Sequence, residues 1–397
     1  MFTTLLTVLW RVLEVLTATL GLATLVATLL PLLRRESWWI RVFDFPRLQV
    51  VGVCVLVLVA GLLLDFQHED WYGPALLVAV AAATVYQVVR ILPYTPFMRK
   101  QALPSTRPLD DRDCQISLLV TNVLMTNRDA SRCLGVIRHA DPDLILAVET
   151  DDWWLDQLRG LEKDYPYTAY APLPNTYGLL LFSRLPLHEP QIRFLMDDDV
   201  PSFHGFVELP CGVKVRLHGL HPKPPAPQEA KTSTRRDAEL LLVGHEIENH
   251  EGPTIVAGDM NDVAWSHTSE LFRRISCLLD PRIGRGLLPT FHADHHLLRW
   301  PLDHVFHSAH FKVARMERLP HIGSDHFPIF IQLSYEPKAE SQQLKNVERP
   351  DEEDWEEARE KIQKGRQEEQ EEETGEASGN KPPYVPGELQ SRLLPGL

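Results

Sequence analysis

The chain has 397 residues, a formal net charge of −14 and 44% hydrophobic residues, which allows one sizeable domain with appended segments. Its hydrophobic residues are concentrated in the first 93 positions, whereas residues 335–397 hold 17 acidic and 9 basic side chains. The rest of the chain is not basic either, so the composition argues against a strong nonspecific grip on nucleic acid.

Three apolar runs come first, at about 13–33, 49–64 and 74–92. Each is close to the roughly 20 residues that a helix needs to cross a bilayer. Four arginines lie between the first two runs, at Arg34, Arg35, Arg41 and Arg47, whereas the next loop has no Lys or Arg. The three runs predict a multi-pass membrane protein, which we expect in a bacterial inner membrane. Loops rich in Lys and Arg stay in the cytoplasm. Everything after residue 93 would then be cytoplasmic, and a missed span would make it periplasmic.

Residues 94–114 are expected to form a linker. After it, residues 115–335 alternate short apolar runs with amphipathic ones, which predicts a layered α/β domain. Residues 336–397 are expected to be a disordered acidic tail, or at most a solvated helix around 351–372. The expected strands are 115–121, 144–149, 178–183, 213–220, 254–259, 302–307 and 326–333, and the expected helices are 128–139, 151–163, 231–249 and 266–276.

The five cysteines are widely spaced and include no CxxC pair. They therefore predict neither a zinc site nor a disulfide framework, and we expect buried or free thiols. They are Cys54, Cys114, Cys133, Cys211 and Cys277.

Acidic and amide side chains follow several of the expected strands. Glu149 ends the run LILAVE, and Asp259 and Asn261 lie in GDMN after TIVA. A carboxylate at a strand end is well placed to hold a hard cation, and Gly258 allows the backbone to turn there. Taken singly, Glu149 also fits a surface acid or helix cap, and GDMN also fits a simple Asx turn.

Histidines accompany these acids. Asp303 precedes the run HVFH, Asp325-His326 opens the last expected strand, and His221 follows VKVRLHGL. An Asp that accepts a hydrogen bond from an imidazole raises the basicity of the ring and fixes its tautomer. Asp303 and His326 are candidates for such a pair, whereas His221 alone also fits a structural histidine.

Together, Asn122, ADPDLILAVE with Glu149, His221, GDMN, Asp303-His304 and Ser324-Asp325-His326 resemble the endonuclease/exonuclease/phosphatase superfamily with its DNase I-like fold. The resemblance covers about 115–335. Its members commonly have Gln before the Glu, where this chain has Val148. The resemblance implies an α/β four-layer sandwich, in which two mixed β-sheets pack face to face between outer helices.

The resemblance also implies roles for the matched residues. Glu149, Asn122 and Asp325 would hold Mg²⁺ or Mn²⁺, because an oxygen-rich site prefers these ions to zinc. Asp259, helped by Asn261, would orient or deprotonate the attacking water. His326, oriented by Asp303, would stabilise the phosphoryl oxygens, with His221 on the opposite side. Tyr177 would contact the phosphate of the substrate.

The sequence thus predicts a membrane-anchored, Mg²⁺- or Mn²⁺-dependent phosphodiesterase or phosphatase. Its partners would be the lipid bilayer and a phosphoester, either a lipid head group, a nucleic acid or a small molecule, with no obligate protein partner. One alternative is a nuclease that acts on DNA or RNA. Another is a non-catalytic membrane scaffold with an acidic interaction tail. The histidine-rich segment TFHADHHLLRW (290–300) is expected to be a loop that faces the substrate.

Overall fold

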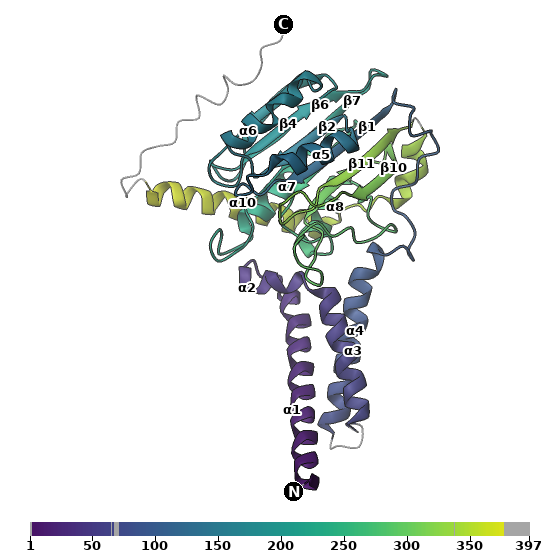
Figure 1. The fold of residues 1–397 in the computed structure, drawn as a ribbon, viewed down its shortest axis with the longest axis vertical. Helices are drawn as coiled ribbons and strands as arrows, with labels where there is room; N and C mark the ends of the chain where they lie inside the picture. Colours follow the sequence, from purple (N-terminus) through teal and green to yellow (C-terminus); the bar gives the residue numbers. More distant parts are fainter. Residues whose placement is uncertain (1, 65, 67–70, 337, 377–397) are drawn as a thin grey trace.

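The computed structural model describes residues 2–64, 66, 71–336 and 338–376. Long apolar helices form a stalk, and a layered α/β domain lies at one end of it (Figure 1).

The stalk is built from α1 (Phe2–Leu29), α3 (Arg47–Leu63) and α4 (Tyr72–Ile91). Among the described residues, Phe2–Leu33 and Tyr72–Tyr94 are long and apolar enough to cross a membrane. A third span arises only if Trp38–Asp44 and Arg47–Leu63, which meet at 71°, count as one. The short connecting elements at the domain end are η1 (Leu30–Leu33), α2 (Trp38–Arg41), η2 (Val42–Asp44) and η4 (Leu92–Tyr94).

The first sheet of the domain has six strands. Parallel pairing joins β1 to β2, and the other neighbours are antiparallel. In spatial order its strands are β10 (Phe311–Arg318), β11 (Ile329–Tyr335), β1 (Gln115–Asn122), β2 (Leu144–Val148), β4 (Leu179–Ser183) and β3 (Tyr167–Ala171).

The second sheet has five strands, of which β7 and β8 are parallel and the others antiparallel. In spatial order they are β5 (Leu187–Phe194), β6 (Pro201–Glu208), β7 (Lys214–Leu220), β8 (Thr254–Asp259) and β9 (Asp303–His307).

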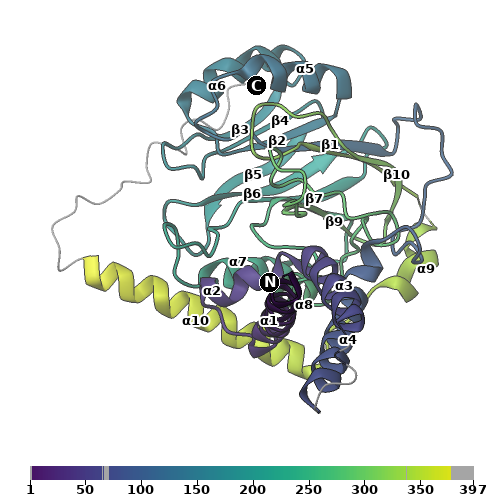
Figure 2. The same cartoon turned by 60° about the horizontal axis from the view of Figure 1, so that its bottom comes forward.

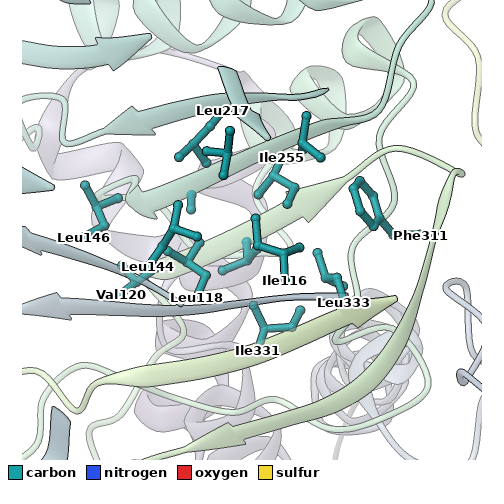
Figure 3. Packing of buried hydrophobic residues seen from close by; sticks show 14 of the residues in the cluster. Ile116, Leu118, Val120, Leu144, Leu146, Leu217, Ile255, Phe311, Ile331 and Leu333 are labelled. Carbon is teal, nitrogen blue, oxygen red and sulfur yellow. The ribbon is translucent and has the colours of Figure 1, made fainter. Parts of the chain in front are cut away.

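The two sheets pack face to face around one apolar core, in which Leu118 and Leu146 of one sheet face Leu217 and Ile255 of the other (Figure 3). Each sheet is covered on its outer side by helices (Figure 2). The expected four-layer α/β sandwich is confirmed. The outer helical elements are α5 (Ala130–Ala140), α6 (Asp152–Leu158) and η5 (Arg159–Lys163) on the first sheet, and α7 (Thr234–Glu248) and α8 (His267–Ser276) on the second.

Disorder is not found in the described part of the tail, whereas the alternative of a helix around 351–372 matches α10 (Glu352–Glu376), although this helix packs on the domain and is not solvated all round. Residues beyond the last strand form α9 (Ala339–Gln343) and η6 (Leu344–Asn346) before this helix. Ala358 of α10 is buried with Leu241 and Leu271 of the two outer helices, and Arg274 pairs with Asp354 at 2.7 Å. A few small apolar contacts and ion pairs therefore hold a helix whose composition is mostly acidic. Residues 377–397 lie outside the described part.

The expectation of free thiols is wrong for two cysteines. Cys114, just before β1, and Cys211, in the turn between β6 and β7, form a disulfide with a Cα–Cα distance of 5.4 Å. This bond joins the amino-terminal end of β1 in one sheet to the turn between β6 and β7 in the other, a pairing that sequence spacing alone does not indicate. Cys54, Cys133 and Cys277 are free.

Candidate functional site

Four polar residues meet where the parallel strands of both sheets end. Asn122 is the last residue of β1, Glu149 follows β2, His221 follows β7, and Asp259 ends β8. Because β1 pairs in parallel with β2, and β7 with β8, the carboxyl ends of each pair lie at the same sheet edge. Face-to-face packing of the sheets then brings the two edges together.

Asn122 links the two carboxylates across the sheets. Its Nδ2 donates to Glu149 Oε1 at 2.7 Å and to Asp259 Oδ2 at 3.1 Å, while its Oδ1 accepts the Leu124 N–H at 3.0 Å. Burial, together with the charges of Asp325 and Asp259, raises the pKa of Glu149 to about 7. The site thus concentrates negative charge on partly desolvated oxygens, and a cation would offset that cost.

Asp259 lies between two imidazoles. Its Oδ2 is 3.5 Å from His326 Nε2 and 3.9 Å from His221 Nε2. Burial acts to raise the pKa of Asp259, but the facing His326 and His221 lower it below its usual value. Burial lowers the pKa of His221 itself. Asp259 is therefore held as a carboxylate whose oxygen faces both rings.

The expected Asp–His pair forms. His326 Nδ1 lies 2.8 Å from Asp303 Oδ2, and both residues are buried. Asp303 opens β9, where it lies opposite Asp259 in the antiparallel register. Burial works against a charge on His326, but the carboxylates of Asp303 and Asp259 raise its pKa to about 10. The ring is thus an imidazolium that points Nε2 toward Asp259.

The turn after β8 depends on its glycine. Gly258 has φ +145°, and a Cβ at this position would lie 1.9 Å from the Leu220 carbonyl oxygen, so only glycine fits. Two residues later the Asn261 N–H donates to Asp259 Oδ1 at 3.0 Å, and Asn261 Nδ2 donates to the Pro222 carbonyl at 3.0 Å. Asn261 therefore ties the β8 turn to the segment after His221.

Two further predicted residues lie at the margin. Asp325 is close enough for its charge to raise the pKa of Glu149 and of His326. The Tyr177 ring lies 5.5 Å from the His221 ring, and its hydroxyl donates to Glu229 at 2.6 Å. The structure thus brings all nine predicted residues into one region, although Tyr177 directs its hydroxyl to a carboxylate.

Among the described residues, ligand atoms of Asp259, Asp303 and His326 lie within 4.8 Å of one another. The hydrogen bond between His326 and Asp303 already explains why two of these three groups lie close together, without a metal between them. The carboxylates of Glu149 and Asp325 are the better oxygen donors for a hard cation.

Sequence reasoning missed the contacts behind and beside the site. Phe291 pairs with His326 through an isolated bridge, and their rings are 5.0 Å apart. His304, next to Asp303 in the sequence, points the other way, with Arg282 at 2.7 Å and the Asp262 carbonyl at 2.8 Å. Strand alternation explains His304, because neighbours in a strand face opposite sides; no pattern marked Phe291.

Comparison with solved structures finds distant likenesses. A humanized TDP2 from D. rerio is 16% identical, covers 56% of this chain and 99% of its own, and has a TM-score of 0.47. The human Nocturnin catalytic domain with bound sulfate is 20% identical, with 58% and 100% covered and a TM-score of 0.46. A mannosyl-6-phosphatase from Bacteroides thetaiotaomicron is 17% identical, with 55% and 100% covered and a TM-score of 0.45.

These likenesses are too weak to carry over a substrate, and comparison with curated proteins gives no match. The sequence itself matches the Endonuclease/Exonuclease/phosphatase family over residues 119–326. That range spans β1 to His326 and contains eight of the nine predicted residues as internal positions and His326 as its last. The match covers more than half of the chain, and the chain belongs to the Endonuclease/Exonuclease/phosphatase family.

Proposed function

We propose that this chain is a membrane-anchored phosphoester hydrolase that depends on Mg²⁺ or Mn²⁺. One observation carries the proposal: the Asp259 carboxylate lies within 3.9 Å of two imidazole nitrogens and within 3.1 Å of the Asn122 amide, which also contacts Glu149. A base, hydrogen-bond donors and carboxylates for a metal thus meet at one point, as phosphoryl transfer to water requires.

Glu149 and Asp325 would hold the cation. Asn122 would join them as a ligand only after its amide turns to present Oδ1, since Nδ2 faces the carboxylates in this structure. When bound, the metal would neutralise charge on the phosphoryl oxygens and polarise the phosphorus centre. The raised pKa of Glu149 supports this assignment, because buried carboxylates close together favour a cation between them.

The side chains of this chain supply the remaining steps. Asp259 orients the attacking water and accepts one of its protons while the water oxygen forms a bond to phosphorus. His326, held by Asp303, and His221, on the other side of Asp259, donate hydrogen bonds to the phosphoryl oxygens. The ester P–O bond breaks with its electron pair on the leaving oxygen, which takes up a proton from solvent.

The proposal is tested by hydrolysis of bis(p-nitrophenyl) phosphate by the purified full-length chain in detergent. We expect turnover with Mg²⁺ or Mn²⁺ that stops when a chelator is added and resumes when excess metal is restored. A protein that is folded by circular dichroism but inactive on this diester and on p-nitrophenyl phosphate with either metal would be the non-catalytic scaffold instead.

We further propose that the domain lies on the cytoplasmic side. The support is charge: Arg34 and Arg35 follow η1 in the connection from α1 to α2, whereas the sequence between α3 and α4 contains no Lys or Arg. The Cys114–Cys211 disulfide argues in the other direction, because such bonds persist in oxidising compartments.

Counting thiols in cells separates these two predictions. Cells are quenched in acid, and the denatured protein is alkylated with a polymer-tagged maleimide without reductant. We expect five mass steps, one for each cysteine, since the cytoplasm would keep Cys114 and Cys211 reduced. Three steps, the pattern of the C114S/C211S control, would put the domain in an oxidising compartment.

A further inference from the structure

The segment that follows Asp259 in the sequence forms hydrogen bonds with the domain end of the stalk. Residues 263–265 follow the GDMN turn, and the hydroxyl of Tyr94, at the end of the α4 span, donates to the Ala264 carbonyl at 2.6 Å. The Trp265 indole donates to the Asp44 carbonyl at 2.7 Å. The segment after Asp259 is therefore fixed to the stalk by buried contacts, and the domain is not free to turn its site away.

A second connection runs through the loop Phe291–Trp300, called here the bridging loop. At one end Phe291 contacts His326, and at the other the Trp300 ring lies 5.8 Å from Phe45 in the connection before α3. At the tip, Gln49 in the first turn of α3 donates to the Leu297 carbonyl at 2.6 Å. The bridging loop thus spans from the site to the start of an apolar helix. Figure 1 shows green loops near α8 at the end of the domain that meets the stalk.

The tip of the bridging loop is apolar and exposed. Leu297 is 83% exposed and Leu298 is 46% exposed. Residues 115–335 are all described, and these two leucines are the only large hydrophobic side chains of that range that are exposed. A domain that buries its other large apolar groups but exposes two together, beside the first turn of a membrane helix, presents them to a nonaqueous surface.

The neighbouring residues fit a bilayer interface. Phe97 and Met98, just past the α4 span, are 88% and 42% exposed, so apolar side chains also line the stalk end of the domain at a second place. His295, His296 and Arg299 flank the two leucines in the sequence. Polar side chains next to two exposed leucines fit a layer in which acyl chains lie below polar head groups, although Arg299 itself donates to the Ala293 carbonyl at 2.9 Å.

We infer that the bridging loop rests in the head-group layer and that the substrate is the phosphoester of a membrane lipid, presented to Asp259 from the bilayer surface. This inference rests on the proposed hydrolase function. A site fixed to the stalk on two sides receives a lipid head group by lateral diffusion. A nucleic acid would have to enter between the domain and the membrane, carrying its charge toward a chain with net charge −14.

The test uses the full-length chain reconstituted into vesicles made from the total polar lipids of the expression host, with Mg²⁺ or Mn²⁺. We expect the release of water-soluble phosphorus from the lipid. The L297D/L298D variant should lower the ratio of the lipid rate to the rate on bis(p-nitrophenyl) phosphate by about tenfold or more, because charged tips no longer insert. L297I/L298I should restore the ratio, which separates lost insertion from lost folding.

The matched control is L109D/L344D, which places the same charges on two exposed leucines outside the bridging loop, and we expect its ratio to equal that of the wild type. Two results would overturn the inference while leaving the hydrolase function standing: lipid untouched by a protein that cleaves the soluble diester or plasmid DNA, or an unchanged ratio in L297D/L298D. Failure on every phosphoester would instead remove the proposed function itself.

Discussion

Asp259→Asn should lower kcat/KM on bis(p-nitrophenyl) phosphate by about 10²- to 10⁴-fold, the range that a positioned general base contributes. The amide keeps the size of the carboxylate and can still accept the Asn261 N–H, but it takes no proton from water and no longer attracts the two imidazoles 3.5 and 3.9 Å away. Because His326 also loses one of the carboxylates that raise its pKa, we expect the loss mainly in kcat.

The control is Asp156→Asn, on an exposed face of α6, where the side chain is 67% exposed. It removes the same charge from a side chain whose ion-pair partner is the exposed Arg159, and it should leave both kinetic constants at the wild-type value. Circular dichroism should show the native fold in both variants, so that the difference in kcat/KM reports the chemistry. If Asp259→Asn keeps more than about a tenth of the activity, Asp259 is not the base, because that is less than a general base contributes.

The site residues that the sequence predicts are those at the ends of strands. Glu149 and Asp259 each follow a fully apolar run, and a run of that kind forms a buried strand whose end is easy to place. Parallel pairing then brings such ends together. What the sequence does not contain is the register between the sheets, so the Asn122 bridge from Glu149 to Asp259, and the inward turn of Phe291 onto His326, could not be foreseen.

The fold shows the same division. The sequence did not reveal four strands, of which β3, β5 and β10 are edge strands and β6 is interior, whereas the strands found from sequence are interior except for β9. Edge strands carry polar residues and irregularities that blur alternation. In β5 the register shifts between His188 and Gln191, and in β10 it shifts between Val313 and Arg315. The acidic composition of α10 concealed the one apolar stripe around Ala358 by which it packs.

The Glu149→Gln variant tests whether Glu149 holds the metal. The change removes one charge but keeps an oxygen that can accept from Asn122 Nδ2, now 2.7 Å from Glu149 Oε1, so the link from Asn122 to Asp259 should persist. Removing a charged first ligand weakens a hard-cation site, and we expect the Mg²⁺ concentration for half-maximal activity to rise by about 100-fold. At saturating metal the remaining activity should recover in part.

A direct measurement of metal binding distinguishes weaker metal affinity from a general loss of catalysis. Mn²⁺ titrated into the protein and followed by electron paramagnetic resonance should show weaker binding to Glu149→Gln, whereas the exposed control Glu251→Gln should bind as the wild type does. A variant with lower kcat but unchanged Mn²⁺ affinity would show that Glu149 acts on the substrate and does not hold the cation. The cation would then have to lie nearer to Asp303 and His326, whose ligand atoms also meet within 4.8 Å of Asp259. In that case the His326–Asp303 hydrogen bond would have to open when the metal binds, whereas a cation at Glu149 and Asp325 would leave that hydrogen bond in place.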